Sequence, residues 1–297
     1  MNIFRRTPNF DFMGKRGIFF ILSTAITVAG LVITFMRGPS LLSFDFTGGY
    51  LTQLQFSQPI DIGAIRNLLI SQGYSDVSLQ KVGEEGKKII IKTKKGGSEL
   101  IPIIKNSFPN QTIEILGEEQ VSPTMGQTIR KQTALACLLA TIGILLYIAV
   151  RFEFRFGVGA IIAIVHDLLV TLAFLAATGR QIDSLVIAAF LTILGYSVND
   201  TVVIFDRIRE NLRGLRKVDK PEDVFNRSIN ETLPRTIITG FTTLLIAVSL
   251  FIWGGPVLHT FAFTIIVGLI TGTYSSIFIA SAIVIAWEKR APHRFKT

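Results

Sequence analysis

The stretch Gly17-Ile-Phe-Phe-Ile-Leu-Ser-Thr-Ala-Ile-Thr-Val-Ala-Gly-Leu-Val-Ile-Thr-Phe-Met36 runs for 20 residues without a charged side chain. A helix needs about 20 apolar residues to cross the hydrocarbon layer of a bilayer. A basic start followed by an apolar run also describes a signal peptide, whose apolar core spans only about 7–15 residues and ends at a small-residue cleavage site. Because this run is longer and no such site follows it, we expect an uncleaved membrane anchor.

Five further apolar stretches are long enough to cross a bilayer. They are Thr133–Val150, Gly157–Thr178, Ser184–Phe205, Ile237–Gly255 and Phe261–Trp287. The composition agrees, because 49% of the 297 residues are hydrophobic and only 17% are charged. Charged residues make up about a quarter of a soluble domain. We therefore predict an α-helical multi-pass membrane protein with six transmembrane helices.

The positions of the basic residues predict the orientation. A net charge of +9 is also typical of proteins that bind nucleic acid, so the location of the charge matters. Eighteen of the 30 Lys and Arg residues lie in the segments 1–16, 151–156, 206–236 and 288–297, all on one side of the predicted spans. Because loops rich in Lys and Arg stay in the cytoplasm, we expect both termini to be cytoplasmic. These segments account for the net charge of the chain, and we expect no nucleic-acid partner.

The segment between the first two spans is the only one long enough for a soluble domain, and it would face the outside. Its pattern predicts the order β-α-β-β-α-β of a ferredoxin-like fold. The expected elements are a strand at Gly49–Phe56, a helix at Ile60–Gln72, strands at Asp76–Val82 and Lys87–Thr93, a helix at Ser98–Phe108 and a strand at Gln111–Leu116.

We divide the chain accordingly into the cytoplasmic N-terminus and first helix (1–36), an α+β extracytoplasmic head (37–132), a five-helix membrane domain (133–287) and a cytoplasmic tail (288–297). The head contains no Cys or His, and Cys137 is the only cysteine of the chain. This excludes a disulfide framework and a Cys-based metal site. The head loops at 83–88 and 92–97 are interpreted as solvated hairpin tips, although an exposed edge strand can also bind a peptide.

Three ionisable residues stand inside the predicted spans: His166 and Asp167 in the third, and Asp200 in the fourth. Such residues are costly in a bilayer and are therefore candidate functional residues. At about 1.5 Å per residue, Asp167 would lie about 15 Å deep and Asp200 about 8 Å from the inner boundary. Each carboxylate could bind and release a proton or Na⁺. Each could instead cap or bridge helices, and Asp167 could reach Thr171 one turn further on.

Asp200 has the more polar surroundings, because Asn199 precedes it, and the fifth span offers it a counterpart. Arg235 stands at the inner end of that span, and Thr239 and Thr243 follow at intervals of one helical turn. The three side chains would share one helix face. An Asp–Arg–Thr relay is one interpretation of this spacing. A snorkelling arginine beside ordinary small-residue packing is the other.

Several enzymatic chemistries find no support in the sequence. The chain has no Gly-x-x-x-x-Gly-Lys-Ser/Thr loop for ATP and no His-Glu-x-x-His zinc motif. Asp167 and Asp200 stand in adjacent spans, as in an intramembrane aspartyl protease. Their estimated depths differ by about 7 Å, however, which is large for a shared proton. We expect a protein that is not an enzyme and binds no cofactor, with H⁺ or Na⁺ as a transported ion.

Five motifs, in chain order, carry a resemblance to a known family. They are Phe44-Asp-Phe-Thr-Gly-Gly49, Val121-Ser-Pro-Thr-Met-Gly126, Val165-His-Asp-Leu-Leu169, Val198-Asn-Asp-Thr-Val-Val-Ile-Phe-Asp-Arg-Ile-Arg-Glu-Asn211 and Thr232-Leu-Pro-Arg-Thr236. Over nearly its whole length the chain resembles the SecF family, the smaller subunits of bacterial SecDF protein-export complexes. We interpret Asp45, Gly48 and Gly49 of the first motif as structural, and the long motif of the fourth span is the most specific.

The resemblance implies half of a resistance–nodulation–division transporter in the bacterial inner membrane, with SecD supplying the other half. It implies that the complex promotes preprotein export through SecYEG, beside YajC-like and YidC-like accessory proteins, and draws on the proton or sodium gradient. It also implies that Asp200 is the essential membrane carboxylate, with Arg235 as its basic partner and Thr239 and Thr243 as its polar lining.

A mechanism follows as a hypothesis, with two alternatives beside it. An ion entering from the outside would neutralise Asp200, release Arg235 and let the fourth and fifth spans repack, so that the head swings with a bound polypeptide. A small-molecule or lipid exporter of the same superfamily should instead have a large apolar pocket and both halves in one chain. A passive scaffold for SecD would tolerate the loss of Asp200.

Overall fold

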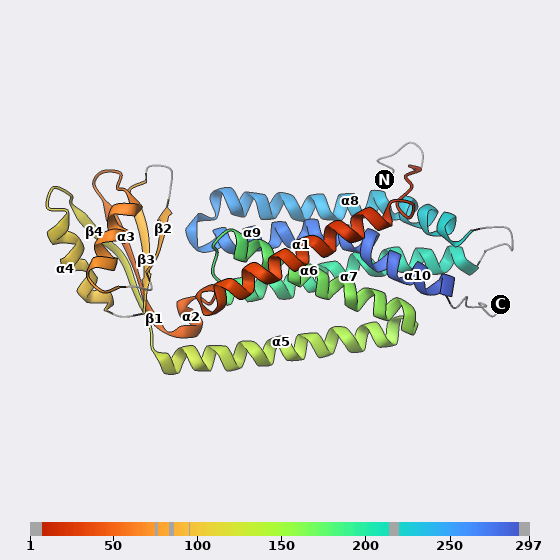
Figure 1. Cartoon of the computed structure of the whole chain (residues 1–297), viewed down its shortest axis with the longest axis horizontal. Helices are drawn as coiled ribbons and strands as arrows, with labels where there is room; N and C mark the ends of the chain where they lie inside the picture. Colours follow the sequence, from red (N-terminus) through yellow and green to blue (C-terminus); the bar gives the residue numbers. More distant parts are fainter. Residues whose placement is uncertain (1–7, 75–76, 83–85, 95, 214–219, 291–297) are drawn as a thin grey trace.

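The computed structural model describes residues 8–74, 77–82, 86–94, 96–213 and 220–290. Within these residues six helices are long and apolar enough to cross a membrane, which confirms the predicted number. The helices lie side by side as a bundle, and the head extends from one end of it, beyond α1 and α5 (Figure 1). Both ends of the described chain lie at the opposite end of the bundle.

Most bundle helices extend beyond the apolar runs, because apolar residues mark only the part inside a bilayer while helical hydrogen bonding continues to the next cap. They are α1 (Arg16–Arg37), α5 (Pro123–Arg151), α6 (Phe154–Ala177), α7 (Ser184–Arg213), α8 (Pro221–Trp253) and α9 (Gly255–Ser275), which continues through a π-helical turn, η2 (Ser276–Ala280), into α10 (Ser281–Arg290). Helix α5 begins ten residues before the predicted span, where the Ser122 hydroxyl accepts a hydrogen bond from the Met125 N–H at 3.2 Å. Such a cap marks a helix start.

The bundle has a buried centre and an exposed outer set of helices. In α6, α7 and α9–α10, 50%, 44% and 67% of the apolar span is buried inside the chain. In α1, α5 and α8 the share is 11% or less. The outer helices therefore leave apolar faces for lipid or for another membrane protein.

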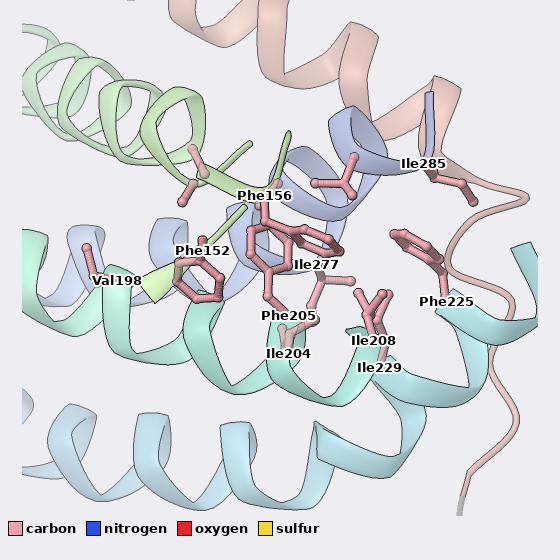
Figure 2. Close-up of a cluster of buried hydrophobic side chains, with 14 of the residues drawn as sticks. Phe152, Phe156, Val198, Ile204, Phe205, Ile208, Phe225, Ile229, Ile277 and Ile285 are labelled. Carbon is pink, nitrogen blue, oxygen red and sulfur yellow. The ribbon is translucent and has the colours of Figure 1, made fainter. Parts of the chain in front are cut away.

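A buried hydrophobic cluster holds α7 at the end of the bundle away from the head (Figures 1 and 2). The Phe205 ring meets Phe152 and Phe156 edge to face, with ring centroids 5.7 and 5.0 Å apart. Phe225 and Ile229 of α8 belong to the same cluster. Edge-to-face pairs contribute about 0.5–1.5 kcal/mol beyond the area they bury. The cluster thus fixes this part of α7 against α8 and the turn between α5 and α6.

The head is a four-stranded sheet with two helices. Its elements are β1 (Gly49–Phe56), α3 (Ile62–Ser71), β2 (Ser78–Val82), β3 (Lys88–Thr93), α4 (Gly97–Ser107) and β4 (Ile113–Val121), and they are preceded by η1 (Gly38–Leu41) and α2 (Phe44–Thr47). The strand order is β2-β3-β1-β4, with every neighbouring pair antiparallel. This confirms the predicted α+β head with its ferredoxin-like order. Residues 83–85 and 95 of the two predicted loops lie outside the described residues.

The head core forms where apolar residues of α3 and α4 pack on one face of the sheet. Ile65 and Leu69 of α3 and Ile104 of α4 are fully buried against Leu54 of β1 and Ile91 of β3. The strand β4 ends five residues later than predicted, because its pairing with β1 continues to the contact of Gly49 with Val121.

The chain before α1 is tied to α8. The Asn226 side-chain oxygen accepts a hydrogen bond from the Phe12 N–H at 3.0 Å. Asn230, one turn further on, accepts from the Phe10 N–H at 3.0 Å and donates to the Phe10 carbonyl at 2.9 Å. These bonds fix the start of α1 beside the first turns of α8.

Candidate functional site

Asp200 lies on α7 with 4% of its surface exposed, and among the described residues only one of its two carboxylate oxygens has a hydrogen-bond partner. Its Oδ1 accepts a hydrogen bond from the Thr236 hydroxyl of α8 at 2.8 Å. Its Oδ2 is buried and has no partner among the described residues. An unsatisfied buried polar atom costs about 1–3 kcal/mol. The open oxygen is therefore a place where a proton or a small cation would be stabilised.

Tyr196 and Gly240 form the wall of this site on the side toward the head end of α7. Tyr196 lies one turn before Asp200 on the same helix. A Cβ placed on Gly240 would come within 3.0 Å of the Tyr196 hydroxyl oxygen and 3.6 Å of the Thr273 hydroxyl oxygen. The missing side chain at position 240 therefore lets α8 approach the polar face of α7.

The other predicted relay residues are on α8 and α7 but do not contact the Asp200 carboxylate in this structure. The Arg235 side chain is exposed, and the ion pairs within 4.0 Å in the part of the chain that the structure describes do not include Arg235 or Asp200. The Thr239 and Thr243 hydroxyls donate to backbone carbonyls of their own helix, each at 2.9 Å. Asn199 is exposed, because neighbouring positions on a helix point about 100° apart.

The contact of Thr236 with Asp200 was not predicted from the sequence. Thr236 directly follows Arg235 in the Thr232-Leu-Pro-Arg-Thr236 motif. The motif therefore indicated the right turn of the helix but not which of its residues faces Asp200. Residues 235 and 236 differ by about 100° around the helix axis, and only packing decides which one faces α7.

Asp167 on α6 has 1% of its surface exposed, and both of its carboxylate oxygens have hydrogen-bond partners. Its Oδ2 accepts from the hydroxyls of Ser197 on α7 and Ser275 on α9, at 2.6 and 2.8 Å. Its Oδ1 lies 3.1 Å from Nδ1 of His166, whose Nε2 contacts the Ser23 hydroxyl of α1. This network joins four helices.

The predicted contact between Thr171 and Asp167 exists in a different form. The Thr171 hydroxyl donates to the Asp167 backbone carbonyl at 2.7 Å and does not reach the carboxylate, because a helical threonine readily bonds the carbonyl four residues earlier. Asp167 and Asp200 also share no hydrogen-bond partner among the described residues, as a proton-sharing dyad would.

Asp45, Gly48 and Gly49 lie where the head meets the bundle. The Asp45 Oδ2 accepts a hydrogen bond from the Ser184 N–H, the first residue of α7, at 3.0 Å. Gly48 ends α2 with a φ of 76°, a conformation that favours glycine. A Cβ on Gly49 would come within 2.4 Å of the Thr93 carbonyl oxygen on β3.

Solved structures resemble the chain over nearly its whole length. The crystal structure of SecDF, a translocon-associated membrane protein from Thermus thermophilus, matches 97% of the chain with a TM-score of 0.85 and 34% identity. The crystal structure of SecDF in the super-membrane-facing form also matches 97%, with a TM-score of 0.72 and 34% identity. The chain spans 40% of each of these longer SecDF chains.

Sequence comparisons point to the same family. The model for the protein export membrane protein SecD/SecF, C-terminal, matches residues 102–290. The protein translocase subunit SecF of Calditerrivibrio nitroreducens is 40% identical over 296 residues, which cover 96% of each chain. That of Pseudomonas aeruginosa is 38% identical and covers 96% of this chain and 93% of the relative. The chain therefore belongs to the SecF family of protein translocase subunits.

Proposed function

We propose that the chain works with a SecD subunit to promote preprotein export through SecYEG, and that it uses the proton- or sodium-motive force by binding the ion at Asp200. The observation that carries this proposal is the buried Oδ2 of Asp200, which has no hydrogen-bond partner within the residues that the structure describes. Binding of a proton or Na⁺ at this oxygen would neutralise the buried charge of the carboxylate, and Na⁺ would also take the oxygen as a ligand. No cofactor and no enzymatic step is part of the proposal.

The geometry suggests how ion binding would change the bundle. In the present state the Thr236 hydroxyl donates to the Asp200 carboxylate. Neutralisation weakens that bond, because hydrogen bonds to a charged acceptor are about twice as strong as neutral ones. Release of the Thr236 bond would then let α7 and α8 shift against each other into a second arrangement. Arg235, Thr239 and Thr243 enter the relay in that second arrangement.

The energy of one ion is sufficient for such a change. Moving one elementary charge across the membrane yields about 2.3 kcal/mol per 100 mV. The conformers of a switching protein differ by only a few kcal/mol. The two SecDF structures match the same share of this chain at the same identity, but with TM-scores of 0.85 and 0.72. This difference supports an arrangement of domains that can change. In our proposal the head swings and moves a bound polypeptide outward.

The exposed helices support a membrane partner. Ile237, Phe241 and Leu245 of α8 and Trp253 at its end leave large apolar side chains exposed. We assign this face to SecD, consistent with the longer SecDF chains, of which this chain spans 40%. We place the complex in the bacterial inner membrane with both termini in the cytoplasm, the head outside, and YajC-like and YidC-like proteins as accessory partners.

The test is the change Asp200→Asn in the chain assembled with SecD and SecYEG in preprotein-importing membrane vesicles. We expect export to fall to the level seen without a gradient while the complex stays assembled. Imposing a proton gradient and a sodium gradient separately identifies the ion. The matched control is Asp206→Asn, which removes a carboxylate of the same helix that forms an exposed ion pair with Arg151. Full gradient-stimulated export by the Asp200→Asn complex would contradict the proposal and favour the alternative that the chain is a passive scaffold for SecD.

A further inference from the structure

The Phe44-Asp-Phe-Thr-Gly-Gly49 motif has no role in the proposed ion relay, although it stands where the head joins the bundle. We define the stem as residues 41–48, which contain the end of η1, the short helix α2 and the residue before β1. Figure 1 shows α2 at the head end of the bundle, between α1 and β1.

The stem is bonded to the start of α7 by backbone and side-chain contacts. Leu42 and Ile182 form a parallel β-bridge, in which the Ser43 N–H donates to the Ile182 carbonyl at 2.9 Å. The Asp45 carboxylate then accepts the Ser184 N–H at 3.0 Å. Residues 45 and 184 are 139 positions apart, so this junction exists only in the folded chain.

Two carboxylates cap α7. The first N–H groups of a helix have no partner within the helix, and a negative charge there is also favoured by the helix dipole. Asp183 accepts the Val186 N–H at 2.8 Å, and Asp45 supplies the second acceptor from the stem. Burial raises the pKa of the Asp183 carboxyl above its usual range, and the nearby charge of Asp45 acts in the same direction. Asp45, which lies outside α7, thus supplies one of the two carboxylates that accept N–H groups at the start of the helix.

The stem is also packed firmly against α5 and continues directly into the head. The Arg130 guanidinium of α5 donates to the Phe46 carbonyl at 2.8 Å. A Cβ on Gly126 would approach the Asp45 and Phe46 carbonyl oxygens to 3.3 Å, so α5 lies directly on the stem backbone. The close approach of Gly49 to β3 shows that the sheet begins where the stem ends. The stem is thus a packed joint between α7 and the head.

We propose that Asp45 is a positioning residue that fastens the stem to α7, so that movement of the helix carrying Asp200 is passed to the head. This inference rests on the proposed function. Asp200 lies 16 residues along α7 from Ser184, which corresponds to about 24 Å of continuous helix. Because α7 is continuous between these residues, a shift or rotation of α7 at Asp200 would also move Ser184, which is bonded to Asp45.

The experiment compares Asp45→Ala with Asp45→Asn in the complete complex in vesicles, and measures ion uptake and gradient-stimulated export in the same preparation. The alanine variant loses the cap, whereas the asparagine variant keeps an oxygen for the Ser184 N–H. We expect Asp45→Ala to lower the ratio of export to ion uptake by about 2- to 30-fold, the equilibrium equivalent of losing a helix cap. We expect Asp45→Asn to restore most of the ratio. An unchanged ratio in the alanine variant would overturn the inference.

A disulfide provides a second test that does not depend on the stability of the alanine variant. Leu42→Cys and Ile182→Cys, in a chain that also carries Cys137→Ser, place one cysteine on each side of the β-bridge. We expect the oxidised complex to keep both ion uptake and export, because the stem and α7 move as one unit. Loss of export on oxidation and its return on reduction would show that the stem must detach, which contradicts the inference. The Asp200→Asn result tests the proposed function separately.

Discussion

Asp167 and Asp200 are buried carboxylates on adjacent helices of the same bundle, yet their surroundings are opposite. Their exposed fractions are 1% and 4%. Asp167 has three side-chain partners, from α6, α7 and α9. Within the described part of the chain, Asp200 has a single hydrogen-bond partner, on α8, and its other oxygen has none. Because an unpaired buried polar atom is costly, hydrogen-bond saturation, more than depth, separates a structural carboxylate from a candidate ion site.

We expect the largest effect for Asp167→Ala. The change leaves His166, Ser197 and Ser275 without their common acceptor, and breaking such a buried network costs about 3–5 kcal/mol. Denaturant unfolding of the purified chain in detergent measures the loss. Asp200→Ala is the matched variant. It should lower the free energy of unfolding by at most about 1 kcal/mol, because it also removes an unsatisfied oxygen. Equal losses at the two positions would refute the distinction.

The second prediction concerns the partner of Asp200. Thr236→Val keeps the side-chain shape but removes the hydroxyl that Oδ1 accepts from. A hydrogen bond to a charged group contributes about 1.5–3 kcal/mol, so we expect gradient-stimulated export to fall by at least about ten-fold. Thr239→Val and Thr243→Val serve as controls, because these hydroxyls bond to backbone carbonyls of α8. A larger loss in either control would favour the relay face inferred from sequence spacing.

We expect the smallest effects for variants that make the surroundings of Asp167 more like those of Asp200. Ser197→Ala and Ser275→Ala each remove one of two bonds to Oδ2 and should each cost about 1 kcal/mol of unfolding free energy. The double variant should cost more than the sum, because only then does Oδ2 lose both hydroxyl donors. Simple additivity, measured by the same denaturant unfolding, would mean that the two hydroxyls are not alternative partners of one oxygen.

Local patterns in the sequence were sufficient for the outline of the fold. The apolar runs predicted six spanning helices, and alternation of apolar residues predicted β1 at Gly49–Phe56, where the structure has it. The β-α-β-β-α-β order and the two aspartates inside the spans were also readable, because periodicity and composition are properties of neighbouring residues. Helix ends were less readable, as the early start of α5 at Pro123 shows.

Patterns of neighbouring residues were thus enough to identify the segments that cross the membrane, the segment that forms the head and the carboxylates that stand among apolar residues. Three contacts became visible only in the folded chain. Thr236 rather than Arg235 bonds to Asp200, serines from α7 and α9 bond to Asp167, and Asp45 accepts the first N–H of α7. The sequence does not show these contacts, because packing between helices determines which face of each helix is buried. Contacts such as that of Asp45 with Ser184 join residues 139 positions apart and leave no periodic signal in the chain.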